Sequence, residues 1–187
     1  MTPLPNRKRM RHEHFDYSQN GAYFITLCIK DNAPLLSEII TEHSGLTDNQ
    51  TPSIIKNDEF VPVVVKLTSV GEIVNSLILD IPVYHPYIDV PHFVIMPNHI
   101  HLIFVINNLD DEFKVKYPHH DKYIANNIIS NIIRGLKSFT TKKVGNSIWQ
   151  TSYYDHIIRD QDDFNTRAQY ILFNPLRWKL DEYYISK

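Results

Sequence analysis

The stretch 87–108, "YIDVPHFVIMPNHIHLIFVINN", constrains the fold most, because it is apolar at successive positions. Side chains of a β-strand alternate between the two faces of a sheet, so such a run belongs to strand buried on both faces. Met96 and Pro97 interrupt it, and the run predicts either one long strand or two strands broken at that point. The chain therefore needs a central sheet with covered faces.

The rest of the chain supplies further strands and the helices that can cover this sheet. Turn residues and β-branched runs predict strands at 21–30, 60–68 and 148–159, and apolar residues at helical spacing predict helices beginning at Thr68 and spanning 121–143 and 160–174. The order β, β, α, β, β, α, β, α predicts an α+β fold: a central antiparallel sheet with helices packed on its faces.

We expect residues 1–187 to form a single domain, since no repeat or composition shift divides them. Within it we expect a basic N-terminal arm at about 1–18, a surface insertion at about 35–61 and a C-terminal tail at 176–187.

Charge and composition limit the partners of the protein. The formal net charge of −2 excludes a grip on nucleic acid by the whole surface, so such a partner must be held locally. Arg134, Lys137, Lys142 and Lys143 form a basic cluster, which is either a solvated surface or a track for DNA phosphates. The absence of a long apolar run predicts that the protein does not enter a membrane. The single cysteine fits a cytoplasmic protein.

His99 and His101 lie on one face of the strand predicted there, about 7 Å apart, so both can contact one metal ion. Two histidines make a weak site without a third ligand, and a pair satisfied by hydrogen bonds is the simpler interpretation. The last helix places Tyr170 and Asn174 four residues apart on one face. A tyrosine hydroxyl is a potential nucleophile and an amide oxygen a potential ligand, although both residues also suit an ordinary helix end.

Four motifs in order favour the metal interpretation: "HFVIMPNHIHLIF", "IIRGLKSFTTKK", "WQTSYYDHIIRDQDDF" and "YILFNPLRW", together with "YSQNGAYFITLC" near the start. With them the chain resembles the REP-associated tyrosine transposases, relatives of the single-tyrosine HUH transposases of small insertion sequences. The resemblance covers most of the chain and implies the HUH transposase fold.

The resemblance also implies roles for individual residues. His99 and His101 match the two metal-binding histidines of the HUH motif, Tyr170 matches the nucleophile and Asn174 falls at the third metal ligand. His156 belongs to the pattern too, as a structural residue, a group behind the ligands or an alternative ligand. Two other tyrosines, at 153 and 154, are rival nucleophiles that rank lower because they precede the last helix.

The implied reaction is metal-dependent nicking and strand transfer of single-stranded DNA, through a 5'-phosphotyrosine intermediate, at hairpins of the REP type. The implied cofactor is Mg²⁺ or Mn²⁺. A domesticated protein that binds hairpin DNA without turnover is the main alternative, and a small metallohydrolase using the histidine pair is a third. A monomer and a homodimer that exchanges the tyrosine helix are both compatible with the sequence.

Overall fold

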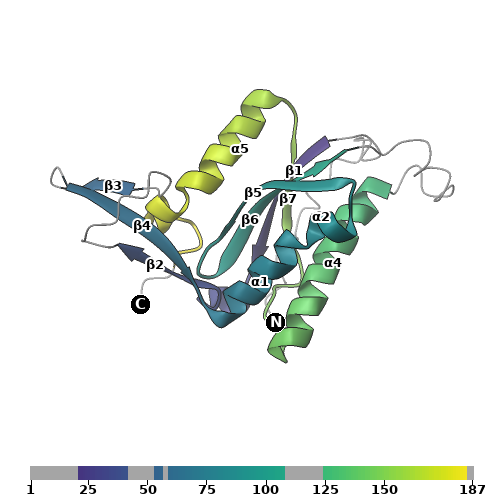
Figure 1. The fold of residues 1–187 in the computed structure, drawn as a ribbon, viewed down its shortest axis with the longest axis horizontal. Coiled ribbons are helices and arrows are strands. Elements are labelled where there is room, and N and C mark those ends of the chain that lie inside the picture. The colour runs from purple at the N-terminus through teal and green to yellow at the C-terminus, as the bar shows by residue number, and fades with distance from the viewer. Residues whose placement is uncertain (1–20, 42–52, 57–58, 108–123, 185–187) are drawn as a thin grey trace, which may run out of the picture.

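The computed structural model describes residues 21–41, 53–56, 59–107 and 124–184, and its centre is a four-stranded antiparallel sheet (Figure 1). The strands are β1 (Gly21–Cys28), β5 (Ile88–Ile95), β6 (His99–Ile106) and β7 (Tyr154–Ile158), in the spatial order β5-β6-β1-β7. The apolar run thus forms two strands joined at residues 96–98, which confirms the second of the two expectations. Of these two strands, β6 is central and β5 is an edge strand with an irregular register between Asp89 and His92.

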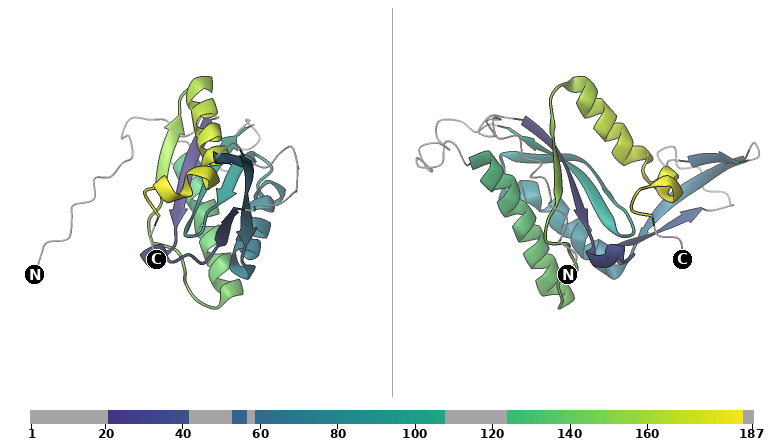
Figure 2. Two further views of the ribbon diagram at one scale, coloured as in Figure 1. Left: turned by 90° about the vertical axis from the view of Figure 1, so that its left-hand side faces the viewer. Right: turned by 180° about the vertical axis from the view of Figure 1, so that it is seen from behind.

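Helices cover both faces of this sheet, as Figure 2 shows from two further sides. The helices are α1 (Ser69–Leu79), α2 (Ile81–Tyr84), α4 (Ile124–Val144) and α5 (Gln161–Phe173), with short 3-10 helices η1 (Lys30–Asn32) and η2 (Pro175–Leu180). α1 and α4 lie against one face and α5 lies against the other (Figure 1). The expected α+β class is therefore confirmed.

Alternation along β6 assigns its side chains to these two layers. Ile100, Leu102 and Phe104 are fully buried in the large core beneath α1 and α4. His99 and His101 point to the other face, together with Ile103, which packs in the smaller core beneath α5. The sheet thus presents its two histidines to the helix that carries Tyr170.

The region expected as a surface insertion contains a second sheet. β2 (Ser37–Thr41), β3 (Ser53–Lys56) and β4 (Glu59–Leu67) pair in the order β2-β4-β3 and project from the main sheet (Figure 1). β4 includes the strand expected at 60–68. Strand β4 contacts η2, so the second sheet lies beside the C-terminal segment.

The strand expected at 148–159 is shorter than its sequence pattern suggests, since β7 begins at Tyr154. Before β7 the chain forms an isolated bridge between Trp149 and Ile29, and the Lys137 ammonium then donates hydrogen bonds to the backbone carbonyls of residues 150, 151 and 152. On the α4 helix, the apolar residues at helical spacing are buried at Ile128, Ile129, Ile132, Ile133 and Leu136, whereas Phe139 is 57% exposed.

Local capping fixes the position of α5. Asp160 is the N-cap and its carboxylate accepts a hydrogen bond from the backbone N–H of Asp163 at 2.8 Å. The helix ends at Asn174, because Pro175 follows and starts η2. The expected start in acidic residues and stop before Pro175 are confirmed. The basic N-terminal arm expected at 1–18 lies outside the described residues.

Candidate active site

Two buried imidazoles with free ring nitrogens form the centre of the site. His99 and His101 are 0% and 2% exposed, and their ring centroids are 4.5 Å apart. The Nε2 atom of each ring is buried and has no hydrogen-bond partner among the described residues. An unpaired buried nitrogen is unfavourable unless something binds it, so both rings are suited to a ligand between them.

Hydrogen bonds on the far side of each ring fix which nitrogen is free. His101 Nδ1 lies 2.8 Å from Thr26 Oγ1, and His99 Nδ1 lies 2.9 Å from Asn98 Oδ1. The amide oxygen can only accept, so His99 Nδ1 carries the hydrogen and its Nε2 holds a lone pair. Partners of this kind orient metal-binding histidines and select their tautomer. Asn98 and Thr26 are therefore positioning residues for the pair.

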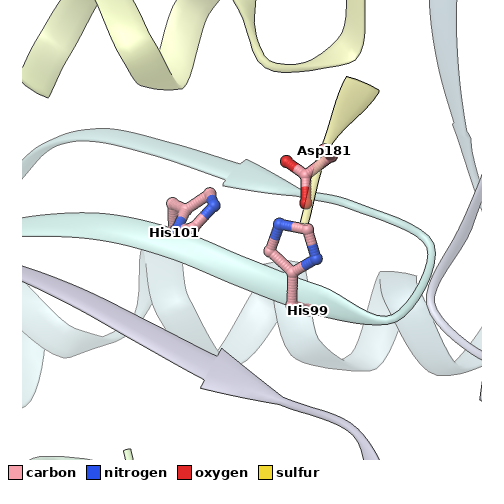
Figure 3. Close-up of side chains that lie close together, drawn as sticks. All are labelled: His99, His101 and Asp181. Carbon is pink, nitrogen blue, oxygen red and sulfur yellow. The ribbon is translucent and has the colours of Figure 1, made fainter. Parts of the chain in front are cut away.

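A carboxylate completes the group. Ligand atoms of His99, His101 and Asp181 all lie within 4.8 Å of one another, and Figure 3 shows the carboxylate of Asp181 beside the two rings. Asp181 follows η2 and comes from the segment expected as a C-terminal tail. Two imidazoles and one carboxylate are a donor set for a divalent transition metal. The residues present fit a metal ion, because they supply three ligand atoms and two of these are otherwise unpaired.

Asn174, expected from the resemblance as the third ligand, lies next to this group. Its Nδ2 donates a hydrogen bond to Asp181 Oδ2 at 2.8 Å, while its own Oδ1 is buried without a partner among the described residues. Asp181 Oδ1 also accepts from the backbone N–H of Tyr183 at 2.8 Å. The Asn174 amide thus orients the Asp181 carboxylate, which lies beside His99 and His101.

Burial keeps both imidazoles neutral. Desolvation lowers the pKa of His99 to about 4, against a smaller opposing effect of Asp181. Desolvation, followed by the proximity of His99, lowers the pKa of His101 well below its usual value. Metal ions bind the neutral form of imidazole, so both side chains are in the ligand form at neutral pH.

Tyr170 lies directly beside the histidine pair. Its ring packs edge-on to His101 with centroids 5.1 Å apart, and edge-on to Phe24 at 5.9 Å. The side chain is 38% exposed, so a substrate can reach it. Burial, followed by the charges of Asp181 and Glu182, raises its pKa to about 12. The hydroxyl is therefore protonated at neutral pH and must lose that proton to act as a nucleophile.

The two rival tyrosines occupy different places. Tyr153 packs against the large core, and its hydroxyl lies 2.9 Å from Ser130 Oγ on α4, on the other side of the sheet from the histidines. Tyr154 is 37% exposed and lies on the histidine face. It pairs with Thr26 of β1, which in turn pairs with His101 of β6. Since β1 separates it from β6, Tyr154 is two strands from the pair.

Sequence reasoning missed two residues that the fold brings to the site. Asp181 had no spacing signal, because it lies in a tail without periodic pattern. The Tyr183 ring lies 4.6 Å from that of His99, and the Tyr183 carbonyl accepts a hydrogen bond from Asn98 Nδ2 at 2.7 Å. Asn98 therefore connects His99 to the segment that carries Asp181.

His156 lies on β7, where it pairs with Phe24 of β1. Its Nε2 donates to Asp163 Oδ2 at 2.8 Å. It is not among the three clustered candidate ligands.

Of the expected DNA-binding residues, Arg134, Lys142 and Lys143 are exposed on α4, which packs on the face opposite the histidines. The Lys137 ammonium is engaged by backbone carbonyls, and its pKa is lowered by burial. The structure therefore separates the basic cluster from the histidine site.

Comparison with known proteins supports the resemblance. No protein-family model matches the chain. An uncharacterized protein of Haemophilus influenzae is 27% identical over 193 residues, covering 98% of this chain and 96% of that protein. A REP-associated tyrosine transposase of Escherichia coli K12 is 24% identical over 111 residues, covering 59% of this chain and 58% of that protein.

A solved structure described as a REP-associated tyrosine transposase bound to a REP hairpin is also similar, with a TM-score of 0.57. It is 19% identical, and the match covers 92% of this chain and 77% of that chain. The resemblance stated from the sequence is confirmed, and this chain shares the fold of that transposase. Among the described residues, no helix is long and apolar enough to cross a membrane.

Proposed function

We propose that this protein cleaves and rejoins single-stranded DNA at hairpin-forming sequences, with Tyr170 as the nucleophile. The observation that carries the proposal is the packing of Tyr170 against His101, in a group that also holds His99 and Asp181. The transposase-like fold and the hairpin bound to its structural neighbour support the choice of substrate.

In the proposed first step the Tyr170 hydroxyl oxygen attacks a backbone phosphorus atom. The bond between phosphorus and the 3' oxygen breaks, the phenolic proton leaves Tyr170 and a proton is taken up by the departing 3' oxygen. The products are a 5'-phosphotyrosine and a free 3' hydroxyl. The step replaces a DNA phosphodiester with a phosphotyrosine diester, so the energy of the bond is kept. The 3' hydroxyl of a different strand can then attack the phosphotyrosine and be joined to the DNA without ATP.

A divalent cation held by His99, His101 and Asp181 would supply Lewis-acid stabilisation of the charge on the phosphate oxygens. The side chains prepare for this in three ways. Thr26 and Asn98 orient the imidazoles, Asn174 orients the carboxylate, and the neutral histidines leave their lone pairs available. Two imidazole donors favour Mn²⁺ over Mg²⁺, because Mg²⁺ prefers oxygen ligands.

Every group in this site belongs to one chain, so a monomer can carry a complete site. We therefore propose that Tyr170 acts on DNA held by its own subunit. The third candidate, a small metallohydrolase, requires three ligands with Tyr170 far away. Three ligands are present, but Tyr170 is beside them, which favours the tyrosine chemistry.

The test uses single-stranded oligonucleotides from the palindromes flanking the gene, incubated with the full-length protein and Mn²⁺ or Mg²⁺. We expect a covalent adduct on a denaturing gel, lost in Tyr170→Phe and kept in the matched control Tyr154→Phe. An adduct formed by Tyr170→Phe would refute the nucleophile assignment, and Tyr183→Phe then tests the nearest other tyrosine. Hairpin binding without an adduct in any metal would instead support the alternative, a DNA-binding protein without turnover.

A further inference from the structure

Arg167 stands on the same face of α5 as Tyr170, about one turn toward the helix start, and nothing in the site described above uses it. The guanidinium carbon lies 5.5 Å from the centroid of the Phe24 ring. Phe24 also stacks on His101 at 5.2 Å and packs edge-on against Tyr170. One aromatic ring therefore joins the guanidinium, the tyrosine and a metal-binding histidine.

An acidic side chain holds Arg167 in place. Arg167 Nε donates to Asp163 Oδ1 at 3.2 Å, while the other oxygen of Asp163 accepts from His156 Nε2 at 2.8 Å. Burial acts to raise the pKa of Asp163, but the hydrogen bonds from His156, the Arg159 backbone and Arg167 lower it overall. The carboxylate is thus charged and anchors the inner edge of the guanidinium.

The outer edge of the guanidinium is available to another acceptor. Arg167 Nη2 lies 3.4 Å from His156 Nε2, but that nitrogen already carries the hydrogen donated to Asp163 and cannot also accept one. Among the described residues no other side chain or carbonyl accepts from the Nη nitrogens. A guanidinium has five N–H donors and the Arg167 side chain is 31% exposed, so a planar pair of donors is open to a ligand here.

The order of groups along this face suggests what that acceptor is. Arg167 lies on the side of Tyr170 toward the start of α5, whereas Asn174 and Asp181 lie beyond the end of the helix. A DNA strand that brings one phosphate to Tyr170 then passes a neighbouring phosphate over Arg167. Guanidinium groups bind phosphate through two parallel hydrogen bonds, which suits the free edge.

We propose that Arg167 binds the backbone phosphate next to the scissile linkage, on the side of Tyr170 away from His99, His101 and Asp181. The contact fixes the register of the strand, so that the neighbouring phosphate meets the tyrosine. This inference rests on the proposed function and names the residue that positions its substrate. His156 and Asp163 gain a role as the pair that orients Arg167.

The first test measures the salt dependence of binding in EDTA, where cleavage does not occur. The probe is a fluorescein-labelled hairpin oligonucleotide with a single-stranded flank. Arg167→Gln is expected to weaken binding about tenfold and to reduce the slope of log affinity against log salt by about 0.7, the value for one single-strand phosphate contact. Arg159→Gln is the matched control, since it removes the same charge from an exposed arginine nearby. Equal slopes for the two variants would overturn the inference.

The second test locates the phosphate. A single neutral methylphosphonate is placed at successive linkages around the cleavage position. Beside that position it should weaken binding of the wild-type protein about tenfold and leave Arg167→Gln unaffected, because the contact is already missing. Coupling at a distant linkage, or none anywhere, would refute the inference. Arg167→Lys, which keeps the charge but not the planar donors, should retain the salt slope and bind less tightly.

These measurements separate the two proposals. If the wild-type protein does not bind the hairpin, the proposed function fails. If it binds and forms the Tyr170 adduct while Arg167→Gln behaves like Arg159→Gln, only the role of Arg167 fails. Thermal unfolding of both variants checks that the α5 layer remains folded.

Discussion

The buried histidine pair makes the stability of the metal-free protein depend on pH. An unfolded histidine has a pKa of about 6.5, whereas burial lowers that of His99 to about 4 in the folded chain. Between these values the unfolded state binds a proton that the folded state does not. Stability is therefore fully present above about pH 6.5 and is lost as the pH falls toward 4.

The size of the effect follows from that difference in pKa. Each unit corresponds to 1.36 kcal/mol, so His99 alone should cost about 3 kcal/mol of unfolding free energy between pH 7.5 and 4. His101 shifts in the same direction and adds to the loss. For a domain with a total stability of about 5–15 kcal/mol this is a large share.

The assay is urea unfolding in EDTA at several pH values, for the wild-type protein and for His99→Gln. The glutamine cannot titrate, so the variant should lose less stability over the same pH range, and the gap between the two curves should approach about 3 kcal/mol. A variant that loses as much stability as the wild-type protein would refute the reasoning. Near pH 7, where both imidazoles are neutral, Mn²⁺ at 100 times its dissociation constant should add about 2.7 kcal/mol to the unfolding free energy.

Three further predictions concern the ligand set and the fold. Asp181→Asn should weaken Mn²⁺ binding at least about tenfold by calorimetry, with Glu182→Gln as control; unchanged affinity would remove Asp181 from the ligand set. Asn98→Ala should weaken Mn²⁺ binding about 10–100-fold, although Asn98 is not itself a ligand, because its side chain orients His99. An affinity equal to that of the wild type would contradict this positioning role. Gly71→Ala should destabilise the protein by about 1–3 kcal/mol in urea unfolding, since an added Cβ would overlap the carbonyl oxygen of Leu36, the residue before β2. Gly135→Ala should instead stabilise by about 0.5–1 kcal/mol, because among the described residues no atom outside the local helix backbone would lie within 4 Å of the added Cβ. Equal effects at both positions would be evidence against this packing.

Local patterns determined most of the fold. The period-two alternation of 99–106 assigned the two histidines to one face and Ile100 and Leu102 to the other, because strand geometry leaves no other arrangement. The acidic start and proline stop of α5 likewise followed from caps, which depend on neighbours in sequence. The pattern overestimated one strand: β7 begins at Tyr154, and the carbonyls of residues 150–152 before it accept hydrogen bonds from Lys137, a contact with a distant helix that the local pattern does not contain.

The amino-acid sequence by itself therefore determined the α+β layers, the histidine pair and the helix that bears Tyr170. Only the tertiary structure decided that Asp181 joins His99 and His101, that Asn174 supports this carboxylate, and that the basic cluster of α4 lies on the other face. The reason is physical. Periodicity and capping act over a few residues, whereas the position of Asp181 depends on how η2 turns after Pro175 and on the hydrogen bond that ties Tyr183 to Asn98, across the chain.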